Sequence, residues 1–345
     1  MPSKSKKLGR RDFIKLSAAG IVGVFLGATI APLVKRLQQP LADVMIAKGN
    51  SYNNDLTGTI RRGISYYSDV LEKVKGGRVV LKPNLIDYDP ARPLNTHPAM
   101  IAAAISALRQ LGAQEVIVAE GSGHNRDMEM ILEQTGVDQV LRDEKVRFVD
   151  LNSDAISLVP LVSNYTKLSQ FFFPNTILGA DLVISMPKLK THHWAGATLS
   201  LKNMFGTIPG VKYGWPKNYL HWYGISQSIA DISTTLDPGF AIVDGIVGME
   251  GDGPLNGTAI NSEVLVMGNN LTAVDSTAAR IMSIYPENLL YLSLMLPYGG
   301  TVNEALINQV GEQITDVQSD FEVLPHMAQI KEKPPLWKRA IISGW

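Results

Sequence analysis

Short apolar runs alternate with amphipathic stretches along most of the chain. Runs such as 78–81, 115–119 and 181–185 are bounded by glycine, proline or polar residues, which predicts buried strands. Further strands are expected over 146–150, 240–243 and 263–267. Helical spacing of apolar residues predicts helices over 55–75, 97–112, 127–136 and 273–284. This alternation predicts an α/β fold with a mainly parallel sheet and helices on both faces.

Capping residues place the ends of two of these helices. Thr96 is the expected N-cap of the helix over 97–112, because Pro98 suits the first helical turn. In the helix over 273–284, the carboxylate of Asp275 is expected to serve that helix's own N-terminus, and a role in the site is the alternative. Both assignments rest on local sequence alone.

The pattern divides the chain into four parts. Residues 1–34 read as an export signal or membrane anchor, and 35–50 as a linker. The α/β domain is expected over 51–325, with a C-terminal tail over 326–345. Segment 151–178 is less regular, and two interpretations stay open, a hairpin or a boundary between two lobes. Ligands of such sheets bind outside the carboxyl ends of the strands, which is the predicted place of a site.

The N-terminus carries the pattern of a twin-arginine export signal. Arg10 and Arg11 are followed by a polar residue, Phe13, an apolar residue and Lys15, and then by an uncharged stretch, 16–34. Its glycine and alanine content favours a signal over an ordinary transmembrane helix. The 19 uncharged residues are nevertheless long enough to remain as an anchor. We expect an extracytoplasmic protein, periplasmic or on the outer face of the cytoplasmic membrane, with the twin-arginine translocase as its partner during export.

Composition excludes several kinds of site. The chain has no cysteine, so it holds no disulfide, no cysteine nucleophile and no Cys-ligated iron–sulfur cluster. The net charge of zero hides an asymmetry, because residues 48–345 contain 24 basic and 30 acidic residues. Nucleic acid is therefore not an expected partner, since phosphate binding needs a basic face. The cofactor stays unknown, and a divalent metal would need histidine or oxygen ligands.

Polar clusters follow four of the predicted strands. In chain order their members are Lys82, Asn84, Glu120, Ser122, Lys188, Lys190, His192, Asp244, Glu250 and Asp252. Because the carboxyl ends of parallel strands meet at one edge of a sheet, we expect these side chains to converge there. A glycine-rich stretch over 196–206 adds Lys202 and Asn203.

The lysines predict a site for a small anionic molecule. Lys188 and Lys190 are two residues apart, so they point the same way in an extended segment. Their ammonium groups suit a carboxylate or a phosphate, and Lys202 with Asn203 is expected beside them. The predicted ligand-binding set is completed by Lys82, Asn84 and Ser122. Solvated surface lysines are the alternative interpretation.

Histidines and aromatic residues surround the same segment. His192 and Glu120 are candidate catalytic groups for proton transfer, and His124 and His221 are candidates to join them. His192 and His193 are adjacent, so in an extended loop their rings are expected to point apart. The tryptophans and tyrosines over 194–223 read either as core or as a lid over a planar ligand.

Three carboxylates form the candidate metal site. Asp244, Glu250 and Asp252 lie in or beside a glycine-rich turn, and oxygen ligands of this kind suit Mg²⁺ or Ca²⁺. The alternative is a tight turn with solvated acidic side chains.

The clusters resemble the family called domain of unknown function 362, whose members are sometimes fused to ferredoxin-type iron–sulfur modules. The matching stretches are 80–84, 96–98, 118–122, 186–192, 199–206, 242–246, 249–254 and 273–275. The resemblance implies that Lys82, Asn84, Lys188, Lys190, His192, Lys202, Asn203, Asp244, Glu250 and Asp252 belong to the family pattern. It implies no reaction, and this cysteine-free chain has no ligands for a ferredoxin-type cluster.

Three functional hypotheses fit these observations. The first is an exported enzyme acting on a small anionic substrate, by racemisation, hydrolysis or transfer. The second is a non-catalytic protein that binds or carries a cofactor or metal for an exported redox partner. The third is a membrane-tethered scaffold, which predicts a shallow surface over 186–206 rather than a cavity.

Overall fold

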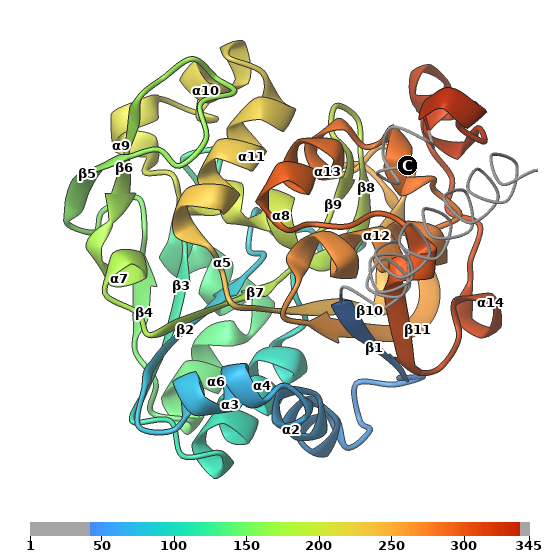
Figure 1. Cartoon of the computed structure of the whole chain (residues 1–345). Coiled ribbons are helices and arrows are strands. Elements are labelled where there is room, and N and C mark those ends of the chain that lie inside the picture. Colours follow the sequence, from blue (N-terminus) through green and yellow to red (C-terminus); the bar gives the residue numbers. More distant parts are fainter. Residues whose placement is uncertain (1–41, 339–345) are drawn as a thin grey trace, which may run out of the picture. The chain divides into compact units, whose positions relative to one another are not determined.

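The computed structural model describes residues 42–338 (Figure 1). The predicted twin-arginine signal or anchor over 1–34 lies outside the described residues and stays a prediction. Within 42–338, no helix combines the length and the apolar character that a membrane crossing requires. The residues from Ala42 onward form one compact unit.

A mainly parallel sheet lies at the centre of this unit. Within residues 42–338 it has ten strands, and eight of them follow the order β12–β1–β11–β10–β7–β2–β3–β4. They are β1 (Ala42–Lys48), β2 (Arg78–Pro83), β3 (Glu115–Glu120), β4 (Phe148–Asp150), β7 (Leu182–Met186), β10 (Phe240–Glu250), β11 (Thr258–Gly268) and β12 (Ile307–Gly311). The neighbours from β10 to β4 are parallel, whereas β11 is antiparallel to both β10 and β1. The predicted fold class is therefore confirmed.

Two short strands extend the sheet beyond β7. After Pro187 the chain continues as β8 (Lys188–His192), which pairs with β10 and with β9 (Gly196–Thr198). The register between β8 and β10 shifts, because Lys188 lies opposite Asp244 and Lys190 opposite Met249. This irregular stretch positions Lys188, Lys190 and His192, which are described below.

Helices cover both faces of the sheet (Figure 1). On one side lie α2 (Leu56–Tyr66), α3 (Ser68–Val74), α4 (Pro98–Gln110), α5 (Met128–Thr135) and α6 (Val137–Asp143). On the other lie α8 (Ser200–Asn203), α11 (Ile225–Leu236), α12 (Leu271–Ile281) and α13 (Leu290–Met295). Successive strand residues alternate between the two cores, as Val79 and Leu81 join the first and Val80 the second. Strands that are covered on both faces are apolar on both, which is why they read as continuous apolar runs.

Two expected boundaries differ from the structure. The predicted linker over 35–50 contains β1, in which Val44 and Ile46 are buried. Its partners β11 and β12 lie more than 200 residues away in sequence, so local periodicity gave no sign of them. The predicted helix over 55–75 is broken at Tyr67, whose backbone is extended and whose hydroxyl donates to the carbonyl of Asp43.

Both predicted caps are also wrong. The N-cap of α4 is His97, whose ring accepts from the amide of Ala99. Thr96 instead donates its hydroxyl to the carbonyl of Met186, which ties this loop to the end of β7. Asp275 lies inside α12, where Asn270 is the N-cap.

Segment 151–178 contains a hairpin. β5 (Ile156–Pro160) and β6 (Gln170–Pro174) pair antiparallel as a separate two-stranded sheet. Because the residues from Ala42 onward form one compact unit, the segment does not separate two lobes. The predicted tail begins as a 3-10 helix, η5 (Pro325–Lys331), and residues 339–345 lie outside the described part.

Candidate functional site

The four polar clusters meet at one edge of the sheet. β2, β3, β7 and β10 run parallel, so their carboxyl ends lie side by side. A cavity of about 340 Å³ is lined by residues that follow these strands and by the segment from Thr198 to His221. Its volume lies within the range of small-molecule sites. The cavity also contradicts the expectation of a shallow surface that the scaffold hypothesis made.

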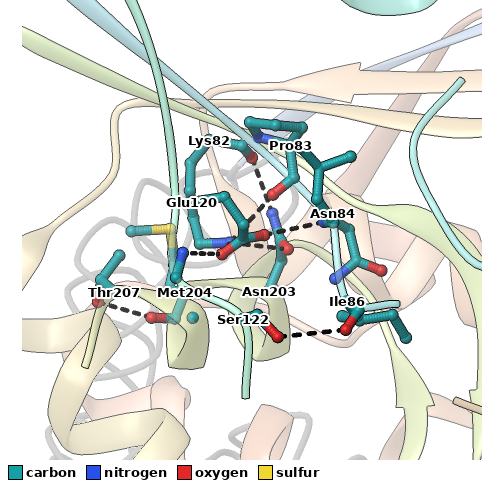
Figure 2. Close-up of polar contacts among 12 residues, drawn as sticks. Lys82, Pro83, Asn84, Ile86, Glu120, Ser122, Asn203, Met204 and Thr207 are labelled. Carbon is teal, nitrogen blue, oxygen red and sulfur yellow. Dashed lines mark hydrogen bonds and ion pairs between the residues drawn. The ribbon is translucent and has the colours of Figure 1, made fainter. Parts of the chain in front are cut away.

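A closed hydrogen-bond network forms one wall of this cavity (Figure 2). The Nζ of Lys82 donates to both carboxylate oxygens of Glu120 at 2.7 Å and to Oδ1 of Asn203 at 3.2 Å. The side-chain Nδ2 of Asn203 donates in turn to the backbone carbonyl of Lys82 at 3.0 Å. Burial lowers the pKa of Lys82, and the charge of Glu120 opposes that shift.

The carboxylate of Glu120 has no free position at which to accept a further hydrogen bond. Besides Lys82, it accepts from the backbone amides of Leu85 at 3.1 Å and Gly121 at 2.8 Å. Four donated hydrogen bonds fill the four lone-pair positions of a carboxylate. We therefore assign Glu120 a positioning role, because it holds Lys82 and two loops, in place of the predicted proton transfer.

Lys188 and Lys190 do not share one ligand, although they are two residues apart. Lys188 donates to Asp244 at 2.6 Å and to the hydroxyl of Tyr52 at 2.9 Å, and it does not line the cavity. Lys190 lines the cavity and donates to the carbonyl of Leu94 at 2.8 Å. Burial and the nearby positive charges of other lysines hold the pKa of Lys190 well below its usual range.

Lys202 and Lys217 complete the basic lining. The Nζ of Lys202 lies 5.0 Å from the centre of the Phe205 ring. Burial and the charge of Lys82 lower the pKa of Lys202 to about 8. Lys217 donates to the carbonyls of Gly121 and Gly206 at 3.0 Å, and burial lowers its pKa to about 7.

Sequence reasoning missed Lys217. It lies among the aromatic residues over 194–223 and outside every stretch that resembles the family. Its backbone is left-handed, with φ of 68°, and its side chain reaches the carbonyls of Gly121 and Gly206. Its charged position within an aromatic segment was the one available signal.

Two of the four histidines that line the cavity have opposite, fixed tautomers. The Nδ1 of His192 accepts from the amides of Trp194 at 3.0 Å and Ala195 at 3.2 Å, so a neutral ring carries its proton on Nε2. The Nδ1 of His221 lies 3.1 Å from the carbonyl of Lys217, which only accepts, so its proton is on Nδ1. Burial lowers the pKa of both rings, which keeps them neutral near pH 7.

The other two histidines at the cavity are His124 and His193. The rings of His192 and His193 were expected to point apart, but their centres are 4.9 Å apart and both line the cavity. Tight turning of the loop after β8 replaces the extended geometry on which that expectation rested. The Nδ1 of His193 lies 3.4 Å from Asp252, near the surface.

Two buried polar atoms of the cavity lining lack a partner. Within residues 42–338, neither Oδ1 of Asn84 nor Oγ1 of Thr198 has a hydrogen bond, and both residues line the cavity. An unpaired buried polar atom costs about 1–3 kcal/mol. Both atoms would gain from a ligand with matching polar groups. Ser122 differs, because its hydroxyl donates to the carbonyl of Ile86 and it does not line the cavity (Figure 2).

The predicted metal ligands are not brought together. Asp244 is occupied by Lys188, the hydroxyl of Tyr52 and the amide of His97. Glu250 instead accepts from the amide of Glu322. Among the residues that the structure describes, no group of three or more histidine or carboxylate side chains is arranged to hold a metal ion.

The aromatic segment lies at the surface more than in the core. Trp194 is 63% exposed and also lines the cavity, whereas Trp222 is 79% exposed and does not. Tyr219 and Tyr223 are exposed as well. Trp194 is thus the residue for which the predicted role as a cover is geometrically supported.

The comparisons with known proteins identify the family. A family model described as domain of unknown function (DUF362) matches residues 79–280. The chain therefore belongs to the DUF362 family, as the sequence resemblance predicted. The thylakoid-associated protein sll1697 of Synechocystis sp. is 26% identical over 226 residues. That alignment covers 62% of this chain and 65% of the relative, which is just under two thirds of the relative's length.

Two solved structures are similar to part of this chain. The lactate racemase apoprotein from Thermoanaerobacterium thermosaccharolyticum is 15% identical with a TM-score of 0.42, over 70% of this chain and 58% of that one. A protein from Thermotoga maritima is 13% identical with a TM-score of 0.32, over 56% of this chain and 50% of that one. Neither likeness bears on the chemistry of the cavity described here.

Proposed function

We propose that this protein binds a small anionic molecule in the cavity and carries out acid–base chemistry on it. The observation that carries the proposal is the composition of the lining, in which four lysines meet one carboxylate. The place of this activity outside the cytoplasm remains the prediction made from residues 1–34.

Charge favours an anion over a neutral or cationic ligand. Glu120 is already paired with Lys82, so the positive charge of the other three lysines has no carboxylate partner within the cavity. Desolvation, and then the charges of neighbouring lysines, lower their pKa values, which is a free-energy cost of the ligand-free protein. A carboxylate or phosphate between Lys190 and Lys202 relieves that cost and gains charge-assisted hydrogen bonds.

The two histidine tautomers supply the acid–base element. His221 has an unprotonated Nε2 that can take a proton from a bound ligand, and a ring of this kind is an effective base near neutral pH. His192 offers an N–H from Nε2, which can donate a hydrogen bond to an oxygen on which negative charge develops. A carrier protein needs the lysines but has no use for this opposed pair.

Calorimetric titration with phosphate, malonate and L-lactate tests the binding. At least one of these anions should bind, and Lys202→Met should weaken its affinity at least tenfold. Lys212→Met is the matched control, because Lys212 also lies over an aromatic ring, Phe172, but is exposed and outside the cavity. Affinity should fall as pH rises from 7 to 9, because Lys217 and Lys202 lose their protons at about 7 and 8.

Deuterium uptake separates enzyme from carrier. Carboxylate probes that bind are incubated with the protein in D₂O, and exchange of their carbon-bound hydrogen is followed by NMR. His221→Phe should abolish exchange and preserve binding if the protein is an enzyme. Binding without exchange by the wild-type protein favours the carrier, and no binding by any anion contradicts the proposed function.

A further inference from the structure

Lys202, which is half-buried, differs from the four buried lysines at this edge of the sheet. Lys82 and Lys188 each have a carboxylate partner, at 2.7 Å and 2.6 Å. Lys190 and Lys217 donate to backbone carbonyls. Within residues 42–338, Lys202 has no hydrogen bond or ion pair, and its ammonium nitrogen lies over the ring of Phe205, 5.0 Å from its centre.

Burial and the charge of Lys82 give Lys202 a larger neutral fraction than a free lysine has. Its side chain lines the cavity, and two other cationic side chains, Lys82 and Lys190, lie close enough for their charges to be felt. With a pKa of about 8, roughly a tenth of the side chain is a free amine at pH 7. An unprotonated lysine in a cavity is a nucleophile toward carbonyl carbon.

The other polar groups of the cavity suit a ligand that carries both a carboxylate and a carbonyl. Lys190 and Lys217 remain to hold the carboxylate, and the unpartnered hydroxyl of Thr198 can donate to it. The Nε2–H of His192 can donate to the carbonyl oxygen, and Nε2 of His221 can accept a proton. One cavity thus contains an amine, a hydrogen-bond donor, a base and anion-binding groups.

We propose that Lys202 forms an imine with a small oxo acid, an aldehyde or ketone that carries a carboxylate. This inference rests on the proposed anion site and assigns its ligand a chemical class. It makes Lys202 a catalytic residue, whereas the other four lysines position the ligand or the loops.

The step is balanced without any oxidant or reductant. The lone pair of Nζ attacks the carbonyl carbon, and the π electrons of the C=O bond move to oxygen, where His192 donates a hydrogen bond. His221 takes a proton from the nitrogen and returns it to that oxygen, which gives a carbinolamine. His221 then takes the remaining proton of the nitrogen and passes it to the hydroxyl group, which leaves as water while the nitrogen lone pair forms the C=N bond. The product is the imine plus one water.

Reductive trapping tests this assignment. The purified protein is incubated with pyruvate or glyoxylate, treated with sodium borohydride, and examined by intact mass and peptide mapping. We expect one adduct per chain, on Lys202, with at least tenfold more adduct than in the Lys202→Arg variant. Lys202→Arg retains a positive charge at this position but has no amine that can form the imine. Lys212→Arg is the matched control and should trap as the wild-type protein does.

The outcomes distinguish this inference from the proposed function. Binding of pyruvate or glyoxylate without an adduct on Lys202 overturns the imine and leaves the anion site intact. Adducts spread over exposed lysines, unchanged in Lys202→Arg, also overturn it. If neither oxo acid binds but phosphate or malonate does, the ligand class is wrong and the site stands. If no anion binds, both proposals fail.

Discussion

Two clusters that contain lysines lie at the same edge of the sheet, and their surroundings differ. The closed cluster, as we define it, contains Lys188, Asp244, Tyr52 and His97. Lys188 is paired with Asp244, and Tyr52 donates to that carboxylate and stacks on His97 at 3.7 Å between ring centres. In the open cluster, which we define as Lys190, Lys202 and Lys217, no lysine has a carboxylate partner among the described residues and all three line the cavity.

The difference separates a structural role from a ligand-binding one. A buried charge whose partners are all in place contributes to a rigid fold, and removal of one partner leaves the other uncompensated. A buried charge that lacks a partner raises the free energy of the folded protein until a ligand supplies it. Residue type is the same in the two clusters, and Lys190 and Lys217 are as buried as Lys188, so for these three side chains the partners decide between the two roles.

The largest expected effect comes from breaking the closed cluster. Lys188→Met leaves the Asp244 carboxylate buried without its counter-charge, which should lower the free energy of unfolding by about 3–5 kcal/mol. Urea denaturation followed by circular dichroism measures the loss. Lys202→Met is the matched control in the open cluster, and it should change stability by no more than about 1 kcal/mol.

A double variant sharpens this test. Lys188→Met combined with Asp244→Leu removes both charges, so it should be more stable than the sum of the two single losses predicts. Strictly additive losses, or equal losses in Lys188→Met and Lys202→Met, would show that the two clusters do not differ in the way described.

A smaller effect should appear in the pH dependence of stability. The pKa of Lys217 is about 7 in the folded protein and about 10.4 in an unfolded chain, so between these values the unfolded chain binds more protons. Stability should therefore rise with pH across this window. The cost of burying the charge is complete below pH 7 and disappears as pH approaches 10.

Urea denaturation at pH 7, 8 and 9 measures this rise. Lys217→Met should reduce the rise in the free energy of unfolding by on the order of 2 kcal/mol over the window. Lys202→Met should reduce it less, because the Lys202 side chain is partly exposed through the cavity. Lys212 is exposed, so Lys212→Met should leave the pH dependence of stability unchanged. Parallel curves for wild type and Lys217→Met would mean that Lys217 is not held as a costly buried charge.

The smallest effect on stability is expected at the mouth of the cavity. Trp194→Ala removes a side chain that is mostly exposed, so the free energy of unfolding should change by about 0.5 kcal/mol or less. Because Trp194 lines the cavity, anion affinity should fall about threefold in calorimetry. Trp222→Ala, on the same surface but outside the cavity lining, should change neither quantity. Equal losses of anion affinity in both variants would contradict the role of Trp194 as a cover of the cavity.

Much of the fold follows from local sequence. The strands that became β2, β3 and β7 were predicted within one or two residues, because each is a short run that is apolar on both faces and bounded by turn residues. β1 was missed because its pairing depends on strands more than 200 residues away. The capping errors have a similar origin, since Thr96 and Asp275 are used by distant partners, the carbonyl of Met186 and the amides of Ser200 and Leu201.

For the site, the sequence determined which side chains gather at the carboxyl edge of the sheet. Residues that follow parallel strands must meet there, so Lys82, Glu120, Lys190 and His192 were all placed at the right edge. The same reasoning could not separate Lys188 from Lys190, because that depends on the shifted register between β8 and β10. Local sequence specifies direction along a strand but not register with a neighbour.

Only the tertiary structure decided which of these groups are free to act. It closed the four acceptor positions of Glu120, paired Asp244 with Lys188, fixed the tautomers of His192 and His221, and left Lys202 without a partner among the described residues. Apart from the tautomer of His221, which the carbonyl four residues earlier sets, each outcome depends on a second atom that comes from a remote part of the chain or from a loop conformation. The chemistry of an ionisable side chain is set by its partners and its burial, and the fold supplies both.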